Sequence, residues 1–237
     1  MEDKNALKTF YKIGGITALL QLTIVPLFIV VTPLLGTRPT EVRDFFEMYQ
    51  TNKLAGLLRD DLSSLLMVVL YLGSLPALFY SLRKVNPVYT TFACLFTLVV
   101  VAGSISTNSS LSFLHLSDQY AAAGSEAQRA QILAAGEAVL VSDMWNSTGA
   151  YFSGILLQGS GVIFSLLMLR SRDFGKITAW SGLLANALDL TQHVLHPFAP
   201  GVSAFISMFF GLFYLVWFPM LARDFLRLSR KTMADQS

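Results

Sequence analysis

The chain has 237 residues, of which 54% are hydrophobic and only 14% are charged. Soluble domains carry about a quarter charged residues, so this balance excludes an ordinary water-soluble globule and favours a polytopic membrane protein. The formal net charge of +2 implies neither nucleic acid nor an acidic partner. The single cysteine, Cys94, lies in an apolar run and cannot form an intrachain disulfide.

Six apolar stretches reach the length of about 17–25 residues that a membrane-spanning helix needs. We therefore predict an all-α fold, with residues 1–237 forming a single integral membrane domain built as a six-helix transmembrane bundle. The first stretch is too long for the apolar core of a signal peptide, so we expect an uncleaved span. The six predicted spans are 13–36, 62–82, 88–108, 147–169, 177–198 and 201–222.

Two long segments between the spans are predicted to contain helices. In residues 40–58 the apolar side chains share one helical face, which indicates an amphipathic helix on the outer membrane surface or capping the bundle. A capping-box pattern from Ser125 to Gln128 indicates that a second helix begins there. That helix can continue unbroken into the fourth span.

The distribution of Lys and Arg predicts the orientation. With a cytoplasmic N-terminus, the inner segments hold 12 of the 17 basic residues, and an even number of spans returns the basic C-terminus to the same side. By the positive-inside rule we expect a multi-pass plasma membrane protein with both termini in the cytoplasm.

The third and fourth spans also carry polar residues on one helical face, and in the third span Asn108 and His115 lie toward the outer end. Thr90, Thr97, Ser104, Asn108 and His115 fall within an arc of about 40° if the third helix continues past Asn108. On the fourth helix, small residues are typical of close helix packing. The same side carries Asp143 and Asn146, with Asp143 expected at the outer water boundary.

The fifth span carries the strongest polar signal. Its members Asn186, Asp189, His193 and His196 are spaced 3, 4 and 3 residues apart, which places them within about 80° of one helical face. Lipid cannot solvate a carboxylate or an imidazole, so this face must turn toward the protein interior or a wet cavity.

Three interpretations of this face are open. The side chains can form a buried network that locks helices together, a site for an ion, proton or polar ligand, or a metal site. His193, His196 and Asp189 could hold a transition metal if another helix supplied a ligand. The sequence implies no other cofactor.

The predicted topology brings these polar residues together at the outer side. We expect an outward-facing polar vestibule that binds or passes a small polar solute, ion or proton. Its candidate ligand-binding residues are Asn108, His115, Asp143, Asn146, Asn186, Asp189, His193 and His196.

Two further functions compete with this binding role. One is a metal-dependent membrane hydrolase using His193, His196 and Asp189, and the other is a structural or sensory membrane subunit. No G-x-S-x-G elbow, phosphate loop or CxxC motif is present, so no catalytic residue is assigned and the sequence does not decide whether the protein is an enzyme. The lipid bilayer is the implied partner, and a homo-oligomer or a second membrane protein stays open.

Two regions resemble an uncharacterised bacterial family of six-span membrane proteins, classed as a domain of unknown function. The first region is LYLGSLPALFYSLRKVNPVYTTFACLF, and the second is GAYFSGILLQGSGVIFSLLMLRSRDFGKITAWSGLLANALDL. The order of spans and long outer segments is similar over nearly the whole chain. The resemblance implies the multi-pass architecture and brings no activity, cofactor or site residue.

Overall fold

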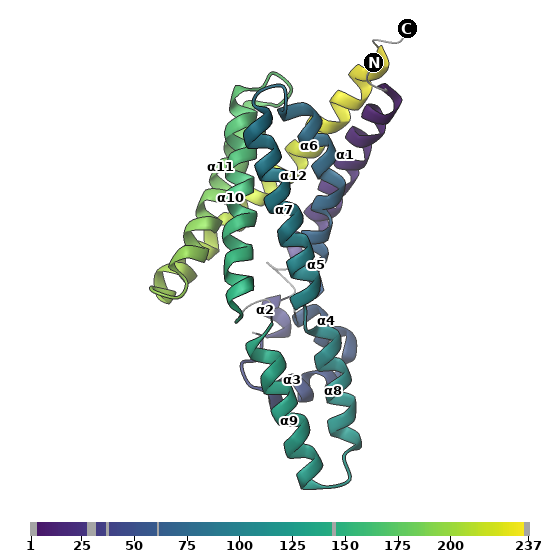
Figure 1. Cartoon of the computed structure of the whole chain (residues 1–237), viewed down its shortest axis with the longest axis vertical. Helices are drawn as coiled ribbons and strands as arrows, with labels where there is room; N and C mark the ends of the chain where they lie inside the picture. The colour runs from purple at the N-terminus through teal and green to yellow at the C-terminus, as the bar shows by residue number, and fades with distance from the viewer. Residues whose placement is uncertain (1–3, 28–31, 37, 61, 144–145, 235–237) are drawn as a thin grey trace. The chain divides into compact units, whose positions relative to one another are not determined.

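The computed structural model describes residues 4–27, 32–36, 38–60, 62–143 and 146–234, and within them the chain forms helices and no strand. The predicted all-α fold class is therefore confirmed (Figure 1). The helices are α1 Lys4–Pro26, α2 Thr32–Leu35, α3 Val42–Thr51, α4 Lys53–Arg59, α5 Leu62–Val69, α6 Tyr71–Leu82, α7 Pro87–Thr107, α8 Ser110–Ala122, α9 Glu126–Val141, α10 Thr148–Arg170, α11 Lys176–Leu195 and α12 Pro200–Ala234.

These helices form two compact units, each assembled from separate stretches of the chain. Unit 1 comprises Met1–Val25, Val69–Val101 and Ser153–Ser237, and unit 2 comprises Pro26–Val68 and Ala102–Phe152. Unit 1 thus holds α6, α11, α12 and most of α1, α7 and α10, whereas unit 2 holds the remaining helices. The prediction of one domain over residues 1–237 stays a prediction.

Four helical segments among the described residues are long and apolar enough to cross a membrane. They are Leu62–Leu82, Pro87–Ala122, Thr148–Arg170 and Pro200–Thr232. The other two predicted spans fall on α1 and α11, in which lysines and buried polar side chains interrupt the apolar run. The predicted span 13–36 also includes residues 28–31, which lie outside the described residues. The described helices therefore support membrane embedding, and the count of six spans stays a prediction.

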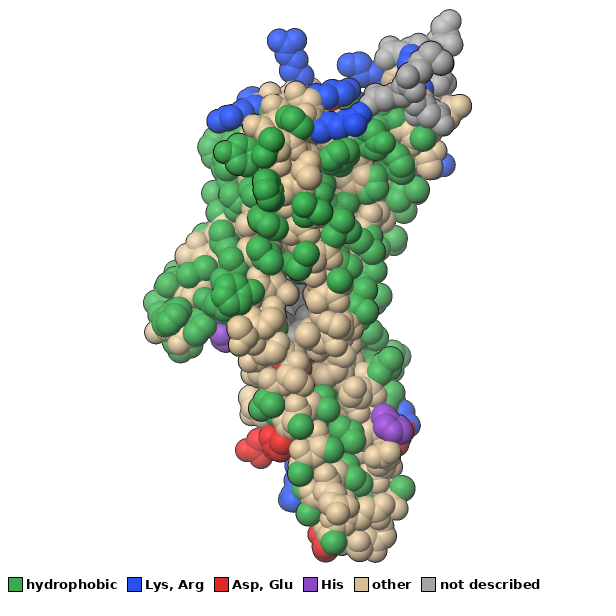
Figure 2. Space-filling view, in the orientation of Figure 1, with side chains coloured by type: hydrophobic (Ala, Val, Ile, Leu, Met, Phe, Trp, Pro, Cys, Tyr) green, Lys and Arg blue, Asp and Glu red, His purple; other side chains and the backbone are tan. Residues whose placement is uncertain are grey.

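Unit 1 carries apolar side chains on its outside and polar side chains in its interior. Large apolar side chains are exposed along α1, α7 and α12, and hydrophobic atoms cover the flanks of the unit in Figure 2. The apolar outside suits lipid, because lipid solvates apolar groups, and the polar side chains buried among the apolar core must find partners inside. The buried polar side chains are Gln21, Ser74, Ser81, Thr90, Thr97, Gln158, Ser160, Ser165, Thr178, Ser181, Asn186, Asp189, Ser203, Asp224 and Ser229.

Unit 2 has an apolar core that α3 shares with α8 and α9. Phe45 and Phe46 on α3 are fully buried, and the Phe45 ring stacks on Phe113 of α8 with centroids 4.4 Å apart. The apolar face of the amphipathic segment 40–58 therefore packs against protein, and its place relative to a membrane stays a prediction. The segment also divides at Asn52, whose side-chain oxygen accepts a hydrogen bond from Ala55 N and caps α4.

The helix before the fourth span begins as predicted and ends earlier than predicted. Ser125 caps α9 by accepting a hydrogen bond from Gln128 N at 3.2 Å. The helix stops at Val141, and α10 begins at Thr148, so the expected unbroken helix does not form. The Asp143 side chain lies within this interruption and has partners there that hold the chain out of a helix.

Substitution of the stacked ring tests the core of unit 2. Because Phe45 has no exposed surface, Phe45→Ala should lower the free energy of unfolding of unit 2 by about 3–5 kcal/mol. Limited proteolysis of the full chain in detergent would then cut unit 2 faster than in the unchanged protein. The matched control is Leu54→Ala, because Leu54 is 67% exposed and its removal leaves no cavity. Equal cleavage rates for the two variants would contradict this description of the core.

Candidate functional site

The eight candidate residues divide equally between the two units. Unit 2 contains Asn108, His115, Asp143 and Asn146, and unit 1 contains Asn186, Asp189, His193 and His196. Each group is described within its own unit, and the shared outer vestibule stays a prediction.

The polar face of α11 turns inward along most of its length. Asn186 and Asp189 are buried, with Asp189 only 5% exposed, as the spacing predicts for a face directed at the interior. The His193 side chain is 26% exposed. His196 is exposed just beyond the end of α11. The polar face of α11 therefore leads from the interior of unit 1 to its surface.

Tyr214 on α12 meets this face from the opposite side. Its hydroxyl oxygen lies 3.1 Å from Asp189 Oδ2, 2.9 Å from Gln158 Oε1 and 3.3 Å from Asn186 Oδ1. A phenol has one proton to donate, so these three oxygens are alternative acceptors of a single hydrogen bond. Asn186 uses its amide nitrogen differently, donating to Gly182 O at 2.7 Å.

The second carboxylate oxygen of Asp189 is paired with an imidazole. His193 Nδ1 lies 3.0 Å from Asp189 Oδ1 and 3.0 Å from the Asp189 carbonyl oxygen. Within the described part of the chain, no Lys or Arg contacts the Asp189 carboxylate. His193 and Tyr214 are therefore the titratable side chains that contact this carboxylate among the described residues. We call Gln158, Asn186, Asp189, His193 and Tyr214 the carboxylate network.

Glycines on α10 allow α11 to approach closely enough for this network. A methyl group at Gly161 would collide with the Asn186 side chain, and one at Gly154 would collide with the His193 ring. The sequence indicated such packing from the small residues of the fourth span. Glycine is needed at these two positions because the side chains of α11 occupy the space that a Cβ would fill.

A metal at His193, His196 and Asp189 stays a prediction. The described residues contain no group of three His, Cys, Asp or Glu side chains placed to hold a metal ion. His196 Nδ1 instead lies 3.5 Å from Ser203 Oγ, while His193 is paired with Asp189.

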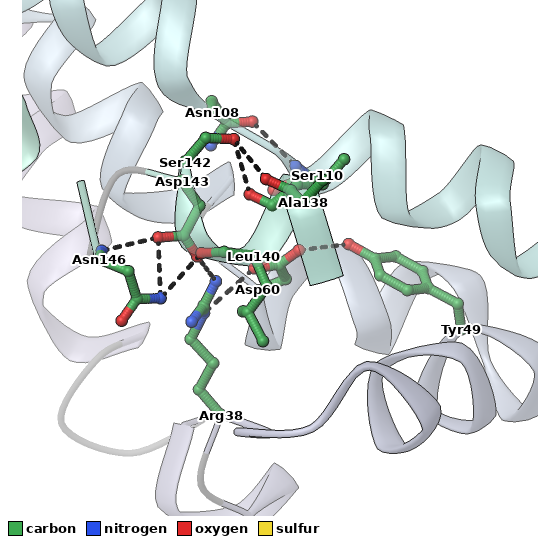
Figure 3. Close-up of polar contacts among 11 residues, drawn as sticks. Arg38, Tyr49, Asp60, Asn108, Ser110, Ala138, Leu140, Ser142, Asp143 and Asn146 are labelled. Carbon is green, nitrogen blue, oxygen red and sulfur yellow. Dashed lines mark hydrogen bonds and ion pairs between the residues drawn. The ribbon is translucent and has the colours of Figure 1, made fainter. Parts of the chain in front are cut away.

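A second polar cluster lies in unit 2 and is centred on Arg38 (Figure 3). Arg38 Nη2 lies 2.6 Å from Asp143 Oδ2, and its Nε lies 3.3 Å from Asp60 Oδ1. Tyr49 donates from its hydroxyl to Asp60 Oδ2 at 2.9 Å. Both carboxylates are fully buried, so Asp143 is not a solvated charge at a water boundary as expected from the sequence. We call Arg38, Tyr49, Asp60, Asp143 and Asn146 the ion-pair cluster.

Asn146 belongs to the same cluster and stabilises the turn between α9 and α10. Its backbone N and its Nδ2 both donate to Asp143 Oδ1, at 2.9 and 3.1 Å, and Nδ2 also donates to Leu140 O at 3.0 Å. The hydrogen bonds from Asn146 to Asp143 therefore close this turn, and the ion pair with Arg38 joins it to another segment. The cluster fixes the connection between three segments, and its geometry indicates a structural role.

The other two candidates of unit 2 lie apart from this cluster's ion pairs. α7 ends at Thr107 and α8 begins at Ser110, so the predicted arc from Thr90 to His115 is broken at Asn108. Asn108 Oδ1 accepts a weak hydrogen bond from Ser110 N at 3.4 Å. His115 is exposed on α8 and its Nε2 lies 2.9 Å from Gln119 Nε2.

Sequence analysis missed Tyr214, Arg38, Tyr49 and Asp60. Arg38 and Asp143 are 105 positions apart, and no periodicity links positions on separate helices. Tyr214 lies among the aromatic residues of α12, where its ring is one of several and its hydroxyl gives no sequence signal. The one feature of Asp60 visible in the sequence is its position next to Arg59, at the end of a segment with helical spacing.

Removal of the central guanidinium tests the ion-pair cluster. Arg38→Met leaves two buried carboxylates without this partner, so unit 2 should lose about 3 kcal/mol of stability, measured by denaturant unfolding in detergent. Lys53→Met is the control, because the Lys53–Asp118 pair is more than half exposed at both ends and should contribute under about 1 kcal/mol. A loss no larger for Arg38→Met than for Lys53→Met would contradict the structural role.

Residues 22–223 match the family described as Domain of unknown function (DUF4386). The match includes α6, α7, α10 and α11, which carry the two regions of resemblance. No curated protein and no solved structure matches the chain. Because the matched residues make up most of the sequence, the chain belongs to the DUF4386 family.

Proposed function

We propose that the protein is a six-span membrane protein that binds and exchanges protons at the Asp189–His193 pair, with both termini in the cytoplasm. The observation that carries the proposal is the buried Asp189 carboxylate, held between Tyr214 and a half-buried imidazole inside a unit with apolar flanks. A membrane interior tolerates such a group where it pairs with another or serves an ion or proton path.

The arrangement of basic residues supports this orientation. Ser229 Oγ donates to Lys8 O at 3.2 Å, and Arg227 Nη2 donates to Asp173 O at 2.6 Å, which brings the start of α1, the α10–α11 turn and the end of α12 to one end of unit 1. Figure 2 shows Lys and Arg side chains gathered at this end. Cytoplasmic ends of membrane proteins carry such an excess. The opposite end of α11, with His193 and His196, then faces outward.

The pair has the chemistry of a proton acceptor and its relay. A proton arriving at His193 Nε2 can be followed by transfer of the Nδ1 proton to Asp189 Oδ1, so the ring ends neutral with its proton on Nε2. The donor and acceptor atoms are 3.0 Å apart, which is hydrogen-bonding distance. His193 is the partly exposed member, so it connects the buried carboxylate to water.

The Tyr214 hydroxyl can form a hydrogen bond whether Asp189 is ionised or protonated. When Asp189 is ionised, the tyrosine hydroxyl donates to it, and when Asp189 is protonated, the same hydroxyl can donate to Gln158 or Asn186. The network therefore accommodates both protonation states with small rotations and no helix movement. This property suits reversible proton binding better than a fixed structural lock.

Proton binding is tested by infrared spectroscopy of the full chain in detergent. Lowering the pH should produce the carbonyl stretch of a protonated, buried carboxylic acid, because the proposed transfer ends with the proton on Asp189 Oδ1. Asp189→Asn should remove the band, and Asp118→Asn, at an exposed carboxylate, should retain it. A band that survives in a folded Asp189→Asn variant would overturn the assignment.

Proton passage is tested separately in liposomes containing a pH-sensitive dye. Under an imposed membrane potential, the unchanged protein should acidify or alkalinise the lumen faster than empty liposomes, and His193→Gln should reduce this rate by about tenfold or more. His115→Gln is the matched control, because His115 is exposed in unit 2. Equal rates for the two histidine variants would contradict a relay through His193.

A further inference from the structure

The cytoplasmic end proposed above is formed largely by two packed helices. α1 and the last part of α12 run antiparallel, because residues of rising number on α1 meet residues of falling number on α12. Ser229 Oγ donates to Lys8 O at 3.2 Å, Tyr11 stacks on Phe225 with ring centroids 6.5 Å apart, and a Cβ added at Gly15 would lie 3.4 Å from Ala222 O. This contact holds two basic segments side by side.

Each of the two helices carries a stripe of basic side chains. On α1 the lysines recur every fourth residue, and on α12 the basic positions fall within an arc of about 100° on the exposed face. We call these side chains the basic stripes. Their members are Lys4, Lys8, Lys12, Arg223, Arg227, Arg230 and Lys231.

The basic stripes have little acidic compensation from their own helices. Asp224 is the one carboxylate among the described residues of α1 and α12, and it is buried. It accepts hydrogen bonds from Gly175 N and Thr178 Oγ1 and pairs with Arg227. Glu2, Asp3 and Asp235 lie outside the described residues. Among the described residues, Arg223, Arg230 and Lys231 make no ion pair and point to solvent.

An exposed apolar surface begins where the α1 stripe ends. Lys12 is followed directly by Ile13 and, one turn later, by Ile16, both more than 40% exposed. A lysine at such a boundary lays its carbon chain along the apolar surface and places its ammonium among phosphates. The basic stripes therefore stand at headgroup depth if unit 1 is embedded.

We propose that the basic stripes bind the headgroups of anionic phospholipids. The inference rests on the proposed membrane embedding and orientation, and it does not depend on proton exchange. A positive-inside bias alone requires basic residues at this end, in any arrangement and with no preference among surrounding lipids. The basic stripes instead hold exposed Lys and Arg side chains on two touching helices, and each Lys or Arg near the surface attracts anionic lipid.

Electron paramagnetic resonance with spin-labelled lipids tests the proposal on the full chain in liposomes. Lipid next to a membrane protein is motionally restricted, and the restricted fraction gives the relative affinity of phosphatidylglycerol and phosphatidylcholine. We expect phosphatidylglycerol to associate about threefold more strongly at low salt, falling toward equality at high salt as charges are screened.

A pair of charge-matched variants separates the stripes from net charge. Arg223→Gln/Arg230→Gln/Lys231→Gln should lose most of the preference, whereas Arg43→Gln/Lys53→Gln/Arg129→Gln, with the same change in charge on unit 2, should keep it. Equal affinity for the two lipids in the unchanged protein, or equal loss in both variants, would overturn the proposal. Absence of restricted lipid of either kind would instead show that the proposed membrane embedding is wrong.

Discussion

The structure of unit 1 depends on finding partners for one carboxylate. Asp189 lies on a helix whose other faces carry exposed apolar side chains, and its own carboxylate is buried, so neighbouring protein groups must solvate the acid. Two neighbouring helices and α11 itself supply these partners. Glycines on α10 admit α11 closely, α12 supplies a phenol, and α11 itself supplies an imidazole one turn away. Each feature would be unremarkable alone, and together they account for the polar interior of an apolar unit.

The buried carboxylates of the ion-pair cluster and of the carboxylate network have different partners. In unit 2, Asp60 and Asp143 share Arg38, a cation that keeps its proton at any accessible pH. In unit 1, Asp189 is paired with His193, which can gain or lose a proton near neutrality. An arginine partner fixes the charge state and therefore suits a structural joint between segments. An imidazole partner leaves the charge state variable, and this difference is the reason to assign chemistry to the carboxylate network and structure to the ion-pair cluster.

The sequence predicted what periodicity and composition can encode. Helix class, the apolar segments and the inward face of Asn186 and Asp189 all follow from local patterns, because side chains three or four residues apart share a helical face. What failed depended on information outside the pattern. The spacing of apolar residues in 40–58 predicts that one face of the helix is covered. It does not predict whether lipid or α8 covers that face. The interruption near Asp143 contains an ion pair to a distant residue and a hydrogen bond to a backbone group, and neither follows a local pattern. Tyr214 contacts Asp189 because α12 packs against α11, and a single sequence does not predict which helices pack together.

The long helix α12 sets the geometry of the carboxylate network from both ends of α11. At the beginning of α11, Asp224 accepts hydrogen bonds from Gly175 N at 2.8 Å and from Thr178 Oγ1 at 2.6 Å, and so acts as a cap supplied by another helix. At the other end, Ser203 lies 3.0 Å from Gln192 Nε2 and donates to Gln192 O at 3.2 Å. Asp189 and Tyr214 lie between these two attachments, one on each helix. Sliding of α11 along α12 would break polar contacts at both ends, so the separation of carboxylate and phenol is set by the backbone. A proton that arrives at Asp189 therefore meets a site already assembled, in which hydroxyl and imidazole protons can rearrange while the helices stay in place.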